Sequence, residues 1–138
     1  MARIKHIAIA TPDPAKTAAF YKEVFDLQEV SPVESPLADG YYLTDGHINL
    51  AILNFKSLEA ADMGEDGLSF AGIHHFGFQV DDAEETCSKL DEVGADRRTR
   101  VTAPDPSMGP AHQNVEIKYK DPVGQIVDVS QTGWVGTS

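Results

Sequence analysis

The segments IKHIAI (residues 4–9) and IHHFGF (residues 73–78) decide the fold of this chain, because they are equivalent parts of an internal repeat. When the sequence is slid along itself by 69 positions, His6 falls on His75 and Asp13 falls on Asp82. Each segment has the apolar character of a β-strand and precedes an acidic residue suited to begin a helix. The chain is therefore predicted to contain two copies of one structural module.

A helix is expected after the first strand of each copy. Pro14 suits a first helical position, and apolar or small residues then recur at helical spacing, namely Thr17, Ala18, Tyr21, Val24 and Phe25. After Asp82 the corresponding stripe is Ala83, Cys87, Leu90 and Val93. Gly94 is placed to end this second helix.

Short strand-like runs bounded by turn residues follow each helix, at residues 27–33, 40–44 and 47–53, and again at 97–101, 114–119 and 126–130. Each half is thus predicted to be β-α-β-β-β. We expect one α+β domain over residues 1–138, with modules at 1–55 and 72–131, a connector at 56–71 and a tail at 132–138. Neither module would be stable alone, because one helix leaves part of a four-stranded sheet uncovered.

Composition excludes several classes of function. The 22 acidic and 11 basic residues give a net charge of −11, which repels nucleic acid. No window approaches the roughly 18 apolar residues of a membrane helix, and the first residues contain no apolar stretch of signal length. Cys87 is the single cysteine and is expected to be a buried apolar residue, which suits a reducing compartment. We expect a cytoplasmic protein without a nucleic-acid or membrane partner.

The repeat brings chemistry-bearing residues into equivalent positions. His6 and His75 each lie near the middle of the first strand of a module, and pseudo-two-fold packing would bring them together. Asp128 stands between Val127 and Val129 on a predicted strand, where a carboxylate needs a counter-charge or a metal. Two imidazoles and a carboxylate can bind a divalent metal, although hydrogen-bonded core residues or an evolutionary relic would give the same pattern. Asn49 is a weaker fourth candidate, because its register in the first module is uncertain.

The pattern around His6, the run HFGFQVD (residues 75–81) and the ending DPVGQIVD (residues 121–128) resemble the glyoxalase, bleomycin-resistance and extradiol-dioxygenase superfamily. The resemblance covers residues 6 to about 130. It implies two modules in a cup-shaped mixed sheet, with metal ligands on the first and last strands of each module. His6, Asn49, His75 and Asp128 fall at those positions. Asn49 and Asp128 are shorter than the usual glutamate or glutamine of the family.

The resemblance implies a metal-dependent enzyme that acts on a small substrate with vicinal oxygens, with Fe²⁺, Mn²⁺, Zn²⁺ or Ni²⁺ as Lewis acid. Dioxygenase, transferase and epimerase or lyase reactions are open, whereas glyoxalase I activity is disfavoured because Asn49 cannot be a general base. His74 and Glu116 are candidate proton carriers, although packing against a helix is the more common role for a residue placed as His74 is. The alternative function is a metal-free protein that binds a drug-like ligand. A homodimer is expected from the family.

Several residues could bind the substrate. Tyr42, Phe78 and Met108 could form apolar walls, although aromatic residues on strands more often belong to the core. Arg98, in a small basic cluster, could hold a substrate carboxylate or phosphate, although a solvated strand end is the more common role. The loop at residues 103–112, which contains Met108, has the proline and glycine content of a shaped lid or of an ordinary surface loop.

Overall fold

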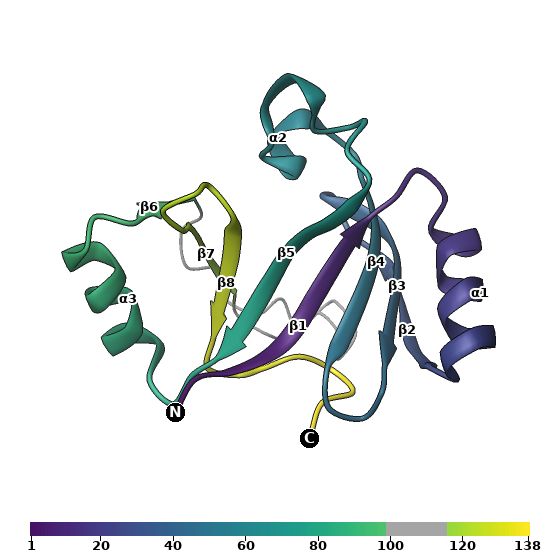
Figure 1. The fold of residues 1–138 in the computed structure, drawn as a ribbon, viewed down its shortest axis with the longest axis horizontal. Helices are drawn as coiled ribbons and strands as arrows, with labels where there is room; N and C mark the ends of the chain where they lie inside the picture. The colour runs from purple at the N-terminus through teal and green to yellow at the C-terminus, as the bar shows by residue number, and fades with distance from the viewer. Residues whose placement is uncertain (99–115) are drawn as a thin grey trace. The chain divides into compact units, whose positions relative to one another are not determined.

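The computed structural model describes residues 1–98 and 116–138 (Figure 1). The strands are β1 (Arg3–Ala10), β2 (Gln28–Glu34), β3 (Ala38–Thr44), β4 (Asn49–Phe55), β5 (Gly72–Gln79), β6 (Asp96–Arg97), β7 (Ile117–Lys120) and β8 (Ile126–Ser130). The helices are α1 (Pro14–Phe25), α2 (Leu58–Ala61) and α3 (Ala83–Glu92), with a short 3-10 helix, η1 (Gly64–Asp66). The predicted α+β class and the β-α-β-β-β order of each half are confirmed.

The eight strands form one mixed sheet in the order β2-β3-β4-β1-β5-β8-β7-β6. The chain divides into two compact units, which we call the metal unit (residues 1–6 and 75–135) and the α1 unit (residues 7–74 and 136–138). The division passes through β1 and β5, so each unit takes part of both strands. The compact units therefore cut across the two sequence modules, and the first six residues group with the second module.

Both long helices begin at the aspartates that the repeat aligned. The side chain of Asp13 accepts a hydrogen bond from the Lys16 amide at 3.1 Å, and Pro14 follows it in the first turn. Asp82 accepts from the Glu85 amide at 2.9 Å in the same way. These caps satisfy amide groups that have no partner within the helix, so the sequence fixes where each helix starts.

One face of the sheet in the metal unit is covered by α3 (Figure 1). The core on that face is built from Phe76, Cys87, Ile117, Tyr119 and Val127. Because neighbouring strand residues point to opposite faces, the residues between them, including His75, Lys118 and Asp128, point to the other face. The packing of α3 thus decides which face of these strands carries the polar residues.

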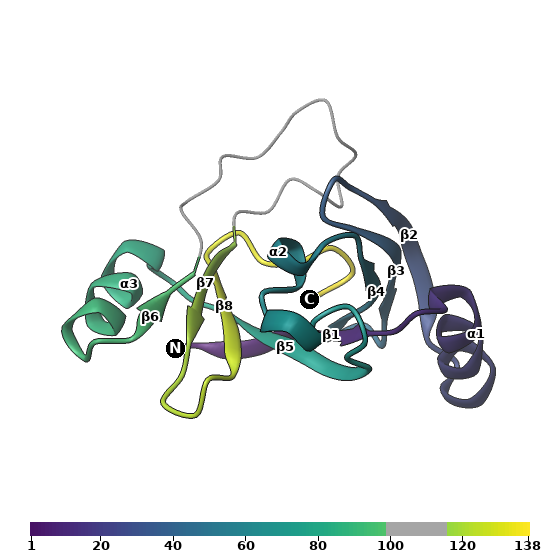
Figure 2. The ribbon, with the colours of Figure 1, turned by 90° about the horizontal axis from the view of Figure 1, so that it is seen from above.

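In the α1 unit, α1 contacts β3 and β4 (Figure 2), and its buried residue Ala18 packs with Leu43 and Ile52. A second cluster contains Ala8, Val33, Ala38, Ala51 and Leu53. Strand β2 lies at one edge of the sheet. It carries Pro32, which lacks an amide donor and is tolerated at an edge.

Three details differ from the sequence-based expectations. The connector at residues 56–71 contains α2 and η1, and the cap of α2 is Ser57, whose side chain accepts from the Ala60 amide at 3.0 Å. Val93 was expected on the apolar stripe of α3, but the helix ends at Glu92 and Val93 is 80% exposed. The strand expected at residues 97–101 corresponds to the short β6, and its last residues lie outside the described part of the chain.

Within the described ranges, no helix has the length and apolar character needed to cross a membrane.

The hydroxyl of Tyr119 ties the sheet of the metal unit to α3. Tyr119 is fully buried and donates to the Asp91 carboxylate at 2.8 Å. Burial, followed by this hydrogen bond, raises the pKa of Tyr119 well above its usual range. The neutral hydroxyl is therefore the form that the fold requires.

We expect Tyr119→Phe to lower the free energy of unfolding by about 1–2 kcal/mol, because it removes a hydrogen bond to a charged group and keeps the ring. Tyr41→Phe is the matched control, since the Tyr41 ring rather than its hydroxyl faces Lys22. Urea unfolding of both variants measures the difference. Equal stability of the two variants would contradict this account of Tyr119.

Candidate metal centre

Strand register brings three candidate ligands to one face of the metal unit. Strand β8 pairs in parallel with β5, and this pairing aligns Asp128 with Gly77. His75 lies two residues before Gly77 and so points to the same face. His6, on β1, completes the group. His6, His75 and Asp128 are all buried, with Asp128 fully inaccessible.

The ligand-capable atoms of these residues lie within 4.8 Å of one another. His6 Nε2 is 3.0 Å from His75 Nε2, and His75 Nε2 is 3.4 Å from Asp128 Oδ2. Ligand bonds of about 2.0–2.2 Å, set at tetrahedral or octahedral angles, would separate neighbouring donor atoms by roughly 2.8–3.6 Å. The donor types and their spacing therefore fit a divalent metal ion. In the absence of an ion, one imidazole must donate its Nε2 proton to the other.

Lys118 lies against the carboxylate of this group. The antiparallel register of β7 and β8 sets Lys118 directly opposite Asp128. Its Nζ donates to Asp128 Oδ1 at 2.7 Å and to Oδ2 at 2.9 Å, and it lies 3.8 Å from Glu116 Oε2. The buried carboxylate is therefore neutralised by an ammonium group. The sequence analysis did not single out Lys118, and only strand register indicates it.

Trp134 covers the imidazole side of the site. Its ring stacks on His6, with centroids 4.8 Å apart and planes 2° from parallel, and its Nε1 donates to Glu116 Oε1 at 2.5 Å. Gly133, with φ of +79°, turns the chain here, and its amide donates to Ser130 Oγ at 3.0 Å. The sequence analysis assigned residues 132–138 to a tail and missed this contact. The single tryptophan of the sequence, next to Gly133, is the feature that could have indicated this contact.

Gly77 makes room for Trp134. A Cβ atom at position 77 would lie 2.6 and 2.7 Å from two ring carbons of Trp134 and 3.2 Å from His6 Cβ. Real Cβ atoms do not approach a ring so closely, so any side chain here displaces the indole. The glycine of the HFGF run is thus explained by the covering of the site.

Two other predicted site residues, Asn49 and His74, belong to the α1 unit. Asn49 begins β4 in the α1 unit and is fully buried, opposite Thr44. His74 is also in the α1 unit, where its Nε2 lies 2.6 Å from the Ala61 carbonyl and its ring packs against Phe55. These are the contacts of a core histidine. Ligation by Asn49 and proton transfer by His74 stay predictions.

Substrate binding by the residues predicted for it stays a prediction. Tyr42 packs against the core of the α1 unit. Phe78 contacts Phe76 edge-on and alternates to the α3 face, opposite to His75, and substrate binding by Phe78 stays a prediction. Arg98 pairs with Asp96 at 2.9 Å. Met108 lies outside the described residues. Glu116, in contrast, is brought into the site through Trp134 and Lys118.

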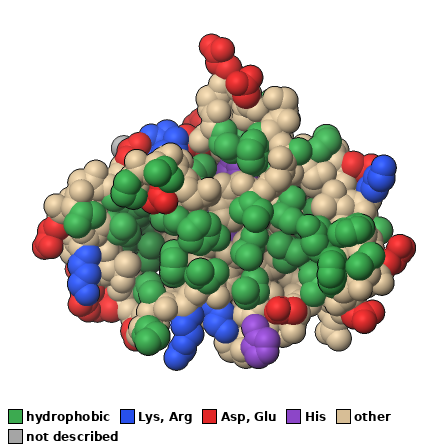
Figure 3. Space-filling view, in the orientation of Figure 1, with side chains coloured by type: hydrophobic (Ala, Val, Ile, Leu, Met, Phe, Trp, Pro, Cys, Tyr) green, Lys and Arg blue, Asp and Glu red, His purple; other side chains and the backbone are tan. Residues whose placement is uncertain are grey.

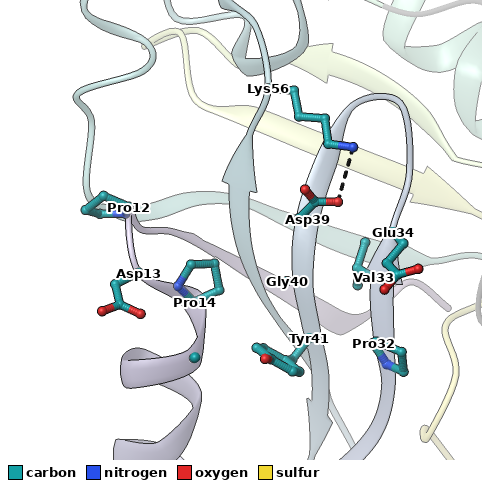
Figure 4. Close-up of a pocket in the computed structure, with 11 residues that line it drawn as sticks. Pro12, Asp13, Pro14, Pro32, Val33, Glu34, Asp39, Gly40, Tyr41 and Lys56 are labelled. Carbon is teal, nitrogen blue, oxygen red and sulfur yellow. Dashed lines mark ion pairs between the residues drawn. The ribbon is translucent and has the colours of Figure 1, made fainter.

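A surface hollow of about 590 Å³ lies in the α1 unit between the start of α1 and strands β2 and β3 (Figure 4). Pro12, Pro14, Pro32 and Tyr41 line it, and Lys56 forms an ion pair with Asp39 at 3.2 Å on its wall. None of the predicted metal ligands lines this hollow. Asp13 and Glu34 also line it, and the Asp13 side chain is used to cap α1.

The chain belongs to the Glyoxalase/Bleomycin resistance protein/Dioxygenase superfamily, whose sequence model matches residues 3–128. None of the curated proteins matches the chain in sequence. The resemblance in the HFGF and DPVGQIVD motifs is therefore confirmed at the level of the superfamily.

Solved structures share the fold at low identity. Hypothetical protein BH1468 from Bacillus halodurans C-125 is 18% identical with a TM-score of 0.73, over 94% of this chain and 93% of that one. Streptomyces coelicolor methylmalonyl-CoA epimerase (Q60A), in complex with 2-nitronate-propionyl-CoA, is 20% identical with a TM-score of 0.69, over 93% and 95%. Methylmalonyl-CoA epimerase from Mycobacterium tuberculosis is 16% identical with a TM-score of 0.67, over 92% and 85%.

We expect Gly77→Ala to destabilise the protein by about 1–3 kcal/mol, because the new methyl group overlaps Trp134. In a Trp134→Ala background the same change should cost much less, since the space is then empty. Chemical unfolding of the two single variants and the double variant gives this coupling. Strictly additive effects would show that the two residues do not compete for one space.

Proposed function

We propose that this protein is a divalent-metal-dependent enzyme that acts on a small substrate with vicinal oxygen atoms. The observation that carries the proposal is the convergence of His6, His75 and Asp128, whose ligand-capable atoms lie within 4.8 Å. Superfamily membership supports it, because the resemblance implies a metal at these positions. Asn49 is proposed as a fourth, weaker ligand.

His6, His75 and Asp128 would hold the ion. A bound ion would supply Lewis acidity, which would orient the substrate oxygens and stabilise negative charge on them. Two neutral imidazoles and one carboxylate suit Fe²⁺, Mn²⁺, Zn²⁺ or Ni²⁺. Trp134 excludes water from the His6 ring and holds Glu116 by its indole N–H. Glu116 is the proposed proton carrier, because Trp134 and Lys118 hold its carboxylate next to the ligand group, to which it does not belong.

Three classes of reaction fit the proposed site. The related epimerases support proton transfer next to a carbonyl as one possibility, and the resemblance also allows ring-opening dioxygenation and group transfer. An asparagine amide has no proton-accepting carboxylate, so Asn49 cannot supply the general base of a glyoxalase I reaction. A carbonyl or enol substrate with a neighbouring oxygen satisfies every remaining class. A thioester of coenzyme A whose acyl group carries a second oxygen function next to the thioester carbonyl is one such substrate.

Ligand binding without a metal is the second candidate function. The observation in its favour is that Lys118 already neutralises Asp128, at 2.7 and 2.9 Å. A buried carboxylate satisfied in this way does not need an ion for stability. In this case His6 and His75 would be a hydrogen-bonded core pair, and the protein would hold a drug-like ligand in the manner of bleomycin-resistance proteins.

We further propose a cytoplasmic homodimer. The single cysteine, Cys87, is buried and free, which suits a reducing compartment. Hydrophobic side chains lie exposed on the face drawn in Figure 3. On α1 the exposed residues are Phe20, Val24 and Phe25, each more than half accessible. A second copy of the chain would remove such surface from water.

Metal content tests the proposed function. Protein purified without chelator should contain a divalent metal close to one per chain by mass spectrometry, and His75→Ala should lose most of it because one imidazole ligand is gone. His47→Ala is the matched control, since His47 is an exposed histidine outside the group. Wild-type protein that holds no metal, and acquires none from iron, manganese, zinc or nickel salts, would favour the metal-free binding function.

A further inference from the structure

We propose that Lys118 is an internal cation that competes with the divalent metal for Asp128 and thereby sets the metal affinity of the site. In the metal-free protein its ammonium group takes the carboxylate, and metal binding exchanges one cation for another. This inference rests on the proposed metal-dependent function. It assigns to Lys118 a positioning role that neither the superfamily match nor the related structures describe.

The competition follows from the atoms involved. Lys118 Nζ donates to both oxygens of Asp128, so each oxygen already has a hydrogen-bond partner in the metal-free protein. Oδ2, which lies 2.9 Å from Nζ, is also the oxygen 3.4 Å from His75 Nε2. An ion bound by His75 and this oxygen would stand close to the ammonium group. Two cations on one carboxylate repel each other, most strongly where water is excluded.

Burial makes the exchange necessary. Asp128 is fully buried between Val127 and Val129, and a buried carboxylate without a counter-charge is costly. In the part of the chain that the structure describes, Lys118 is the one lysine or arginine within ion-pair distance of Asp128. The sheet register holds the two residues opposite each other, so the pair forms whenever the sheet forms. The metal-free site is therefore already neutralised.

Lys118 can also withdraw. Its side chain is 23% exposed, whereas that of Asp128 is wholly buried, so the ammonium group reaches the carboxylate from the side nearer to water. A lysine side chain is long and flexible, and Glu116 Oε2 lies 3.8 Å from Nζ. The ammonium group can keep this second carboxylate as a partner after it leaves Asp128. Glu116 is itself held by Trp134, so the alternative partner is fixed in place.

The test compares metal binding by wild type, Lys118→Met and Lys118→Gln after removal of bound metal by chelator. Zn²⁺ and Mn²⁺ are titrated by calorimetry, with Lys120→Met as the charge-matched control. Lys120 lies on the same strand, two residues away, and pairs in register with Ile126 rather than Asp128. Both Lys118 variants should bind metal about tenfold or more tightly than wild type and Lys120→Met, on the scale of other outer-sphere effects. Lys118→Gln keeps a hydrogen-bond donor for Asp128 should Lys118→Met fold poorly.

Thermal unfolding supplies a second readout. Without metal, Lys118→Met should melt at a lower temperature than Lys120→Met, because Asp128 is left without a counter-charge. With saturating Zn²⁺ the order should reverse, because the ion then neutralises Asp128 without a competing ammonium group. A purely structural role of Lys118 would instead lower the melting temperature in both conditions and weaken metal binding.

The outcomes separate this inference from the proposed function. If wild type binds metal and both Lys118 variants bind it equally or more weakly, the competition is refuted and the metal-dependent function stands. If the variants bind metal and wild type does not, the competition is supported and the metal-dependent function of the natural protein fails. If none of the proteins binds metal, both proposals are overturned.

Discussion

The buried carboxylate of Asp128 requires a positive partner, and the strands around it are arranged so that a partner is always within reach. Lys118 stands opposite it on β7, and His75 reaches it from β5. The desolvation cost of the carboxylate is offset while the ammonium group of Lys118, or an ion, carries positive charge next to it. The polar face of the metal unit is organised by this single requirement.

The contacts that meet this requirement form a closed ring of six residues. The ring runs from Asp128 to Lys118, Glu116, Trp134, His6 and His75, and then returns to Asp128. It contains ion pairs, hydrogen bonds and one ring stack, and it closes over Gly77, whose missing side chain leaves room for the indole. A change at one member alters the polar balance of the others, because the buried members His6, His75 and Asp128 cannot replace a lost partner with water.

Sequence reasoning found the parts of this ring that local chemistry reveals. His6 and His75 were found from the repeat, and Asp128 was found because a carboxylate between two valines on a strand is costly. Lys118 could not be found in this way, since a lysine in a strand-like run is ordinary at a surface and its partner is set by the register of β7 and β8. Trp134 was missed because its position depends on a turn at Gly133 beyond the last strand.

The sequence by itself determined the α+β class, the two β-α-β-β-β halves, the helix starts at Asp13 and Asp82, and the two equivalent histidines. All of these follow from periodicity, capping and repetition, which act over a few neighbouring residues or between aligned segments. The tertiary structure alone decided which lysine faces Asp128 and which side chain covers His6. It also decided that the first six residues group with the second module. Those outcomes depend on strand register and on the path of the tail, which are fixed by packing between segments distant in the sequence.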